Sequence, residues 1–122
     1  VHPVAGRPMI ERVIRAVKAA GAKEVRVVVG FGENLVRPIV EAEGGVCYRQ
    51  EKQLGTADAV RSAQPDKLSG DVVILNGDHP LMEAADIERF RREFKESKAA
   101  LAVVTCELKD PASFGRIVRH QG

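Results

Sequence analysis

Short apolar runs alternate along this chain with segments of helical periodicity, and this alternation limits the possible folds more than any other feature. Runs rich in apolar or β-branched residues, bounded by glycine or polar residues, cover 25–29, 46–48, 71–75 and 100–106. Apolar residues recur at helical spacing over 8–21, 33–43, 56–64 and 83–97. Strands that alternate with helices form βαβ units. The sequence therefore predicts an α/β domain, with one mostly parallel sheet between helices and an edge strand near its end, in 110–119.

The charge balance excludes partners that bind through bulk electrostatics. The 122 residues include 19 Lys and Arg against 17 Asp and Glu, a net charge of +2. We therefore expect no nucleic acid and no membrane among the partners. Cys47 and Cys106 lie apart in apolar runs, which is typical of a reduced compartment, and no apolar run has the length of a membrane span. These features indicate a cytoplasmic protein.

Polar residues follow the run 71–75, at a position where ligands bind in open parallel sheets. Asn76 and Gly77 lead to Asp78. A carboxylate held at the end of a strand can bind Mg²⁺ and, through it, phosphates. It can equally be a turn or cap residue, and the residues alone leave both open. His79 is not expected to be a second ligand, because neighbours on an extended chain point in opposite directions.

A polar hook, residues 50–56, joins the run 46–48 to the next helix. Its side chains include Gln50 and Gln53, whose amides can match the N–H and carbonyl edge of a pyrimidine. Gly55 has no Cβ, so its backbone N–H can approach a flat ligand, and Thr56 is expected to cap the following helix. By this chemistry alone, a polar loop with an ordinary threonine cap remains the favoured interpretation.

Three motifs, in order, resemble the bacterial UDP-N-acetylglucosamine pyrophosphorylases. They are LGTADAV after the glutamine hook, LNGDHPL at a strand end and DPASFGRIVR downstream. The opening VHPVAGRPMIERVI is similar to the segment after that family's signature loop, so the resemblance covers essentially the whole chain. It implies a Rossmann-like fold of the nucleotide-diphospho-sugar transferase type, with helices on both faces of the sheet.

The resemblance also implies roles for individual residues. Gln50 and the backbone of Gly55 and Thr56 would bind the edge of uracil, and Gln53 would line the same pocket. The ribose would pass Asn76 and Gly77, and Asp78 would bind Mg²⁺. Gly115, in FGRI, would place a main-chain amide against the acetamido sugar.

The implied reaction joins UTP and N-acetylglucosamine-1-phosphate into UDP-N-acetylglucosamine, a cell-wall precursor, and releases pyrophosphate. The alternatives are a pyrophosphorylase for another sugar-1-phosphate or pyrimidine nucleotide, and a nucleotide-binding module without catalysis. The missing sugar-side residues would decide between sugars.

The chain also departs from the family's pattern. The glycine-rich signature loop would precede Val1, and the downstream glutamate and asparagines are absent. We therefore expect residues 1–122 to be part of one nucleotidyltransferase domain, incomplete at both ends, without catalytic residues and inactive alone. A central strand would be missing between 25–29 and 71–75. A homo-oligomer through a further C-terminal domain is one arrangement that the resemblance allows. Asp58 replaces a more usual histidine, and Phe114 a usual tyrosine.

Overall fold

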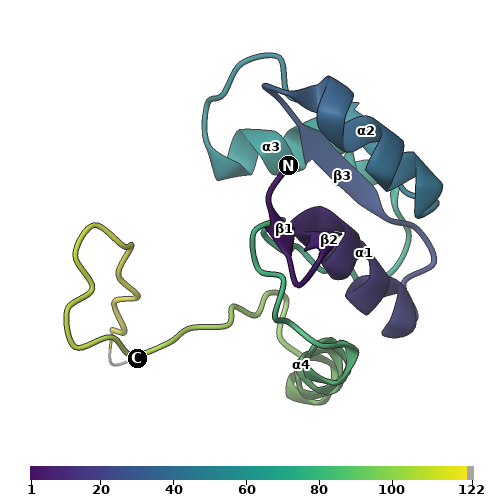
Figure 1. Cartoon of the computed structure of the whole chain (residues 1–122). Coiled ribbons are helices and arrows are strands. Elements are labelled where there is room, and N and C mark those ends of the chain that lie inside the picture. The colour runs from purple at the N-terminus through teal and green to yellow at the C-terminus, as the bar shows by residue number, and fades with distance from the viewer. Residues whose placement is uncertain (121–122) are drawn as a thin grey trace.

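The structure is a computed structural model that describes residues 1–120. After a short hairpin at the start, helices and strands alternate as far as residue 62 (Figure 1). The strands are β1 (Pro3–Val4), β2 (Arg7–Pro8), β3 (Arg26–Val29) and β4 (Val46–Arg49). The helices are α1 (Met9–Ala19), α2 (Glu33–Ala42), α3 (Thr56–Ser62) and α4 (Ala84–Ser97), with a short 3₁₀ turn at Pro65–Lys67. The α/β class is thereby confirmed.

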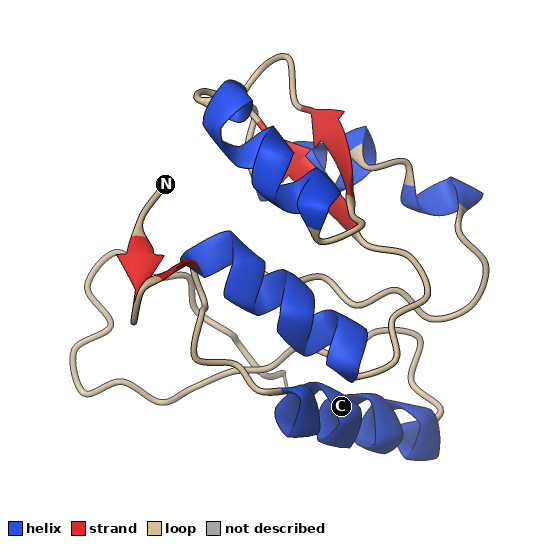
Figure 2. Cartoon of the chain, turned by 45° about the vertical axis from the view of Figure 1, so that its right-hand side comes forward, coloured by secondary structure: helices blue, strands red, loops and turns tan. Residues whose placement is uncertain are grey.

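A parallel pair of strands, β3 and β4, forms the centre of the fold. Their register runs from Arg26 opposite Val46 to Val29 opposite Arg49. The β-branched run favours the strand, and α2 provides the connection that parallel strands require. Helix α2 covers one face of the pair, and α3 lies behind it in both views (Figures 1 and 2). The predicted βαβ unit is therefore present.

Helix α1 agrees closely with its predicted range. Pro8 is its N-cap and not its first helical residue. Gly21, just past the C-cap Ala20, has φ +84° and donates its N–H to the carbonyl of Lys18 at 2.9 Å. A residue of left-handed conformation after the last turn is a common helix end, and glycine adopts it without a Cβ penalty.

The core is small and lies where α1 packs against α2 and α4. Its buried hydrophobic residues within the described part of the chain are Val13, Ile14, Ala20, Val29, Val40 and Ile87. Ile14 and Val40 are almost completely buried, at 1% and 0% exposure. This core packs α1, β3, α2 and α4 together.

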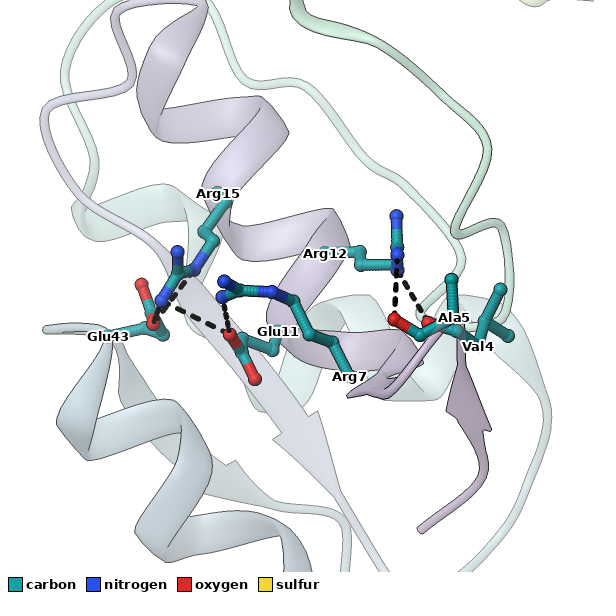
Figure 3. A network of polar contacts seen from close by, with 7 residues as sticks. All are labelled: Val4, Ala5, Arg7, Glu11, Arg12, Arg15 and Glu43. Atoms are coloured by element: carbon teal, nitrogen blue, oxygen red, sulfur yellow. Dashed lines mark hydrogen bonds and ion pairs between the residues drawn. The ribbon is translucent and has the colours of Figure 1, made fainter.

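Ion pairs add contacts on the surface between α1 and α2 (Figure 3). The guanidinium of Arg15 donates to the carboxylate of Glu43, just after α2, at 2.7 Å and also lies 3.1 Å from Glu11. Arg12 donates to the carbonyl of Val4 at 2.9 Å and thereby holds the β1–β2 hairpin against α1. Exposed ion pairs of this kind contribute about 0–1 kcal/mol each to the free energy of unfolding, so they add little to the stability of the fold.

The prediction of three further strands is wrong for this structure. They were expected at 71–75, at 100–106 and in the tail 110–119. None of these segments belongs to a sheet among the described residues. Val72, Val73 and Ile74 are 44%, 36% and 58% exposed, although their side chains are apolar. A strand exists only through hydrogen bonds to a neighbouring strand, and these segments have none.

A cavity of about 890 Å³ separates β3 from residues 71–77. Apolar side chains of α1, α3 and α4 complete its wall, among them Ile10, Val60 and Ile87. On its other edge β3 bonds to β4, so within residues 1–120 its edge toward the cavity carries no strand. The cavity therefore lies where the resemblance leads us to expect a further strand.

Candidate functional site

The polar hook is anchored at the carboxyl ends of β3 and β4. Its first residue, Gln50, follows the last residue of β4 and donates its backbone N–H to the carbonyl of Val29 at 2.8 Å. Val29 is the last residue of β3. The hook therefore lies at the edge of a parallel sheet where ligands bind in open α/β folds.

The side chain of Gln50 is held by the hook itself. Its amide nitrogen Nε2 donates to the carbonyl of Gly55 at 3.2 Å and to the carboxylate of Asp58 at 2.9 Å. Asp58 lies in the first turn of α3, so the bond spans the turn between strand and helix. Sequence reasoning missed this role of Asp58, because a separation of eight residues across a turn matches no helical or strand period.

Gly55 occupies a conformation that requires glycine. Its φ is +106° and its ψ is −179°, a region that is essentially restricted to glycine. It is also the N-cap of α3, whose first residue is Thr56, and α3 has no side-chain cap hydrogen bond. The expectation that Thr56 caps this helix is therefore wrong, because the turn places Thr56 inside the helix.

Gln53 extends back toward the end of β3. A Cβ placed on Gly30, the residue after β3, would lie 3.3 Å from its Nε2. The absence of a side chain at Gly30 therefore makes room for the amide of Gln53. Both glutamines of the hook thus lie close to the end of the same strand.

The segment Asn76–Asp78 forms a turn beside the start of α1. A Cβ on Gly77 would meet Cδ1 of Ile10 at 3.3 Å. The side chain of Asp78 is 73% exposed, and its Oδ1 lies 3.8 Å from Nε2 of His79. The argument that Asp78 and His79 point in opposite directions is wrong here, because the chain turns at this position and is not extended.

Asp78 suits a metal ion that is shared with phosphates. Among residues 1–120, no three His, Cys, Asp or Glu side chains come together as a metal site. Mg²⁺ is usually held by one or two carboxylates, with water and substrate phosphates as its other ligands. A single exposed carboxylate fits that mode and does not fit a site made of protein ligands alone.

Some of the predicted site residues line the cavity and others do not. Thr56, Asn76 and Gly77 are among the residues that line it. Gly115 is not part of this group: it lies in the segment after α4, which extends away from the helices and strands in Figure 1. Among the described residues, no atom beyond its neighbours lies within 4 Å of a Cβ placed on Gly115, and its φ is not in the left-handed region.

Arg26 is a further residue that sequence reasoning missed. Its guanidinium Nη1 donates to the carbonyls of Ala63 and Gln64, each at 2.7 Å, and lies over the ring of Tyr48 with 5.2 Å to the centroid. A hydrogen bond to Glu24 raises the pKa of Arg26 above its usual value. The side chain thus fastens the residues just after α3 to the amino end of β3.

Two further groups near the strand ends have shifted pKa values. A hydrogen bond from Arg37 lowers the pKa of Glu33, at the start of α2. Burial raises the pKa of the Cys47 thiol in β4. Cys47 is therefore less reactive as a nucleophile than a free thiol, which is consistent with a packing role.

The helices of the described region fall short of a membrane span. None of them, within residues 1–120, has both the length and the apolar character that a membrane crossing needs.

Comparison with known proteins gives a consistent result. The family of MobA-like NTP transferase domains matches residues 1–119. The bifunctional protein GlmU of Bdellovibrio bacteriovorus is 64% identical over all 122 residues. Proteins of the same name from Trichlorobacter lovleyi and Pelotomaculum thermopropionicum are 42% and 40% identical over 98% of the chain. The chain spans 27%, 26% and 26% of the lengths of these relatives, about a quarter.

Proposed function

The chain belongs to the family of MobA-like NTP transferase domains, and on that premise we propose that it contributes the nucleotide-binding part of a sugar-1-phosphate uridylyltransferase. The whole enzyme joins UTP and N-acetylglucosamine-1-phosphate into UDP-N-acetylglucosamine and releases pyrophosphate. We place this reaction in the cytoplasm, where it would supply a cell-wall precursor. The GlmU relatives support a sugar-phosphate nucleotidyltransferase in general.

The observation that carries the proposal is the position of the polar hook. Gln50, with a half-buried amide, lies at the carboxyl ends of two parallel strands, where a nucleotide base can reach it. The glycine-only conformation of Gly55 brings bare backbone to the same turn. Gln53 lies at the end of β3 and can line the base pocket.

The ribose and the phosphates would extend from the hook toward the turn Asn76–Asp78. Asn76 and Gly77 would contact the ribose, as the resemblance implies, and both belong to the same turn as Asp78. Asp78 would hold Mg²⁺, which when bound offsets the negative charge of the triphosphate. Gly115 is proposed to contact the acetamido group in the complete enzyme, by the resemblance of FGRI.

Catalysis in this reaction depends on positioning. The phosphate of the sugar attacks the α-phosphorus of UTP in line with the departing pyrophosphate, and no protein nucleophile is required. The residues of this chain therefore act by holding the base and the phosphates in the geometry of attack. On this proposal the chain contributes to the reaction by binding and orientation.

The first test is substitution of Asp78 in the whole natural protein. Asp78→Asn should lower the rate of pyrophosphate release by orders of magnitude and leave the far-UV circular dichroism unchanged. Asp66→Asn, a substitution of another exposed aspartate in the 3₁₀ turn, is the matched control and should keep full activity. A near wild-type rate for Asp78→Asn at saturating Mg²⁺ would show that Asp78 is only a turn residue.

The second test addresses the substrates. Pyrophosphate release should require UTP and N-acetylglucosamine-1-phosphate, with lower rates for CTP, thymidine triphosphate and glucose-1-phosphate. Gln50→Ala should weaken UTP binding by about 1–3 kcal/mol, because a buried base edge loses its hydrogen-bond partner. Efficient turnover of another sugar-1-phosphate or of thymidine triphosphate would replace the proposed substrates within the same reaction class.

A further inference from the structure

The carboxylate of Asp58 accepts a hydrogen bond from Gln50, and this contact has a chemical consequence for the base. The Nε2 atom of Gln50 lies 2.9 Å from Oδ2 of Asp58 and 3.2 Å from the carbonyl oxygen of Gly55. Both side chains are half-buried, so water screens the bond only in part. The contact joins the end of β4 to the first turn of α3.

These two acceptors determine which way the amide of Gln50 faces. A primary amide has two N–H donors on its nitrogen and an acceptor oxygen, and its two ends have nearly the same shape. Carbonyl and carboxylate oxygens accept hydrogen bonds and do not donate them, so Nε2 must face Gly55 and Asp58. Rotation by half a turn would place Oε1 against two oxygens. Both N–H donors are therefore used within the chain, and Oε1 is the polar atom left for a ligand.

We propose that Asp58 is a positioning residue that makes the hook selective for bases with a ring N–H, an inference that rests on the proposed function. Uracil carries N3–H, which can donate to Oε1 of Gln50. Cytosine has an unprotonated nitrogen at the same ring position, so two acceptors would face each other. A rotated amide would remove this conflict, and Asp58 prevents the rotation. Asp58 acts through Gln50 and does not contact the base.

The test compares UTP and CTP affinities of the whole natural protein by isothermal titration in the presence of Mg²⁺. In Asp58→Asn the new side chain has almost the same shape and can turn either its oxygen or its nitrogen toward Gln50, so that only the longer bond to the carbonyl of Gly55 still opposes rotation of the amide. The ratio of UTP to CTP affinity should fall about tenfold. Asp58→Glu, which keeps a carboxylate, should retain more of the ratio than Asp58→Asn does.

A second variant keeps the prediction testable if Asp58→Asn does not fold. Asp58→Ser places a group that both donates and accepts in the first turn of α3, where serine is well tolerated. It should lose selectivity as Asp58→Asn does, with an unchanged far-UV spectrum. If either folded variant loses UTP and CTP affinity equally, Asp58 has only a structural role and the proposal is overturned.

A double-mutant cycle separates this proposal from the proposed function. In the Gln50→Ala protein, the further change Asp58→Asn should leave the UTP-to-CTP ratio unchanged, because the amide on which Asp58 acts is gone. If Gln50→Ala itself changes neither UTP affinity nor the ratio, the base-reading hook of the proposed function fails. If Gln50→Ala lowers the ratio and Asp58→Asn does not, only the role of Asp58 fails.

Discussion

Gly55→Ala should destabilise the folded protein through backbone strain alone. The φ of +106° and ψ of −179° at Gly55 lie in a region that residues with a Cβ almost never adopt. Residues held in such regions cost about 1–3 kcal/mol. A Cβ at this position would meet no atom within 4 Å, so steric clash adds nothing to this cost. We therefore expect the free energy of unfolding to fall by about 1–3 kcal/mol.

The measurement is urea unfolding of the whole natural protein, followed by circular dichroism. Gly115→Ala is the matched control, because a Cβ there also meets no atom within 4 Å and φ is not in the left-handed region. Its free energy of unfolding should change little. Replacement of Gly55 by D-alanine, introduced by chemical ligation, gives a second control, since a D-residue adopts positive φ without strain.

The reasoning would be refuted by either of two results. An L-alanine variant as stable as the wild type would show that the turn relaxes into an allowed conformation at no cost. A D-alanine variant as unstable as the L-alanine variant would show that the loss comes from the added methyl group and not from the backbone angles.

Three further predictions follow from the charges, the thiols and the cavity. Because the pKa of Glu33 is lowered in the folded protein, its pairing with Arg37 stabilises the fold fully above the unfolded-state pKa of about 4.3. This stabilisation is lost as the pH falls through the folded-state pKa. In Glu33→Gln, the free energy of unfolding should therefore fall less steeply with decreasing pH, as measured by urea unfolding at a series of acidic pH values. Cys47, with its raised pKa, should react with iodoacetamide more slowly than the exposed Cys106 at pH 8, and equal rates in a mass-spectrometric assay would contradict this. Residues 1–122 alone should unfold with little cooperativity and release no pyrophosphate, since β3 and residues 71–75 border a large cavity and do not pair with each other. A cooperative, active monomer would disprove this.

The unit formed by β3, α2 and β4 shows which parts of the fold local sequence pattern can predict. The β-branched run 25–29, the helical spacing over 33–43 and the apolar run 46–48 together predicted this unit. Each signal lies within a few residues of the element that it forms, so the elements can be inferred without knowledge of their neighbours. The positions of the hook and of Asn76–Asp78 after apolar runs were visible for the same reason.

Tertiary structure decided what no local pattern contains. The run 71–75 has the composition of a buried strand, yet within residues 1–120 it pairs with no other strand, because pairing depends on a neighbour that can come from anywhere in the chain. Gly55 carries its positive φ because the hook must turn from β4 into α3, which its identity alone does not reveal. The bond between Gln50 and Asp58 likewise forms only when that turn folds, since it is the turn that brings an amide and a carboxylate eight residues apart to 2.9 Å. Periodicity along the chain determines the elements, and the closure of turns and the pairing of edges determine which side chains meet.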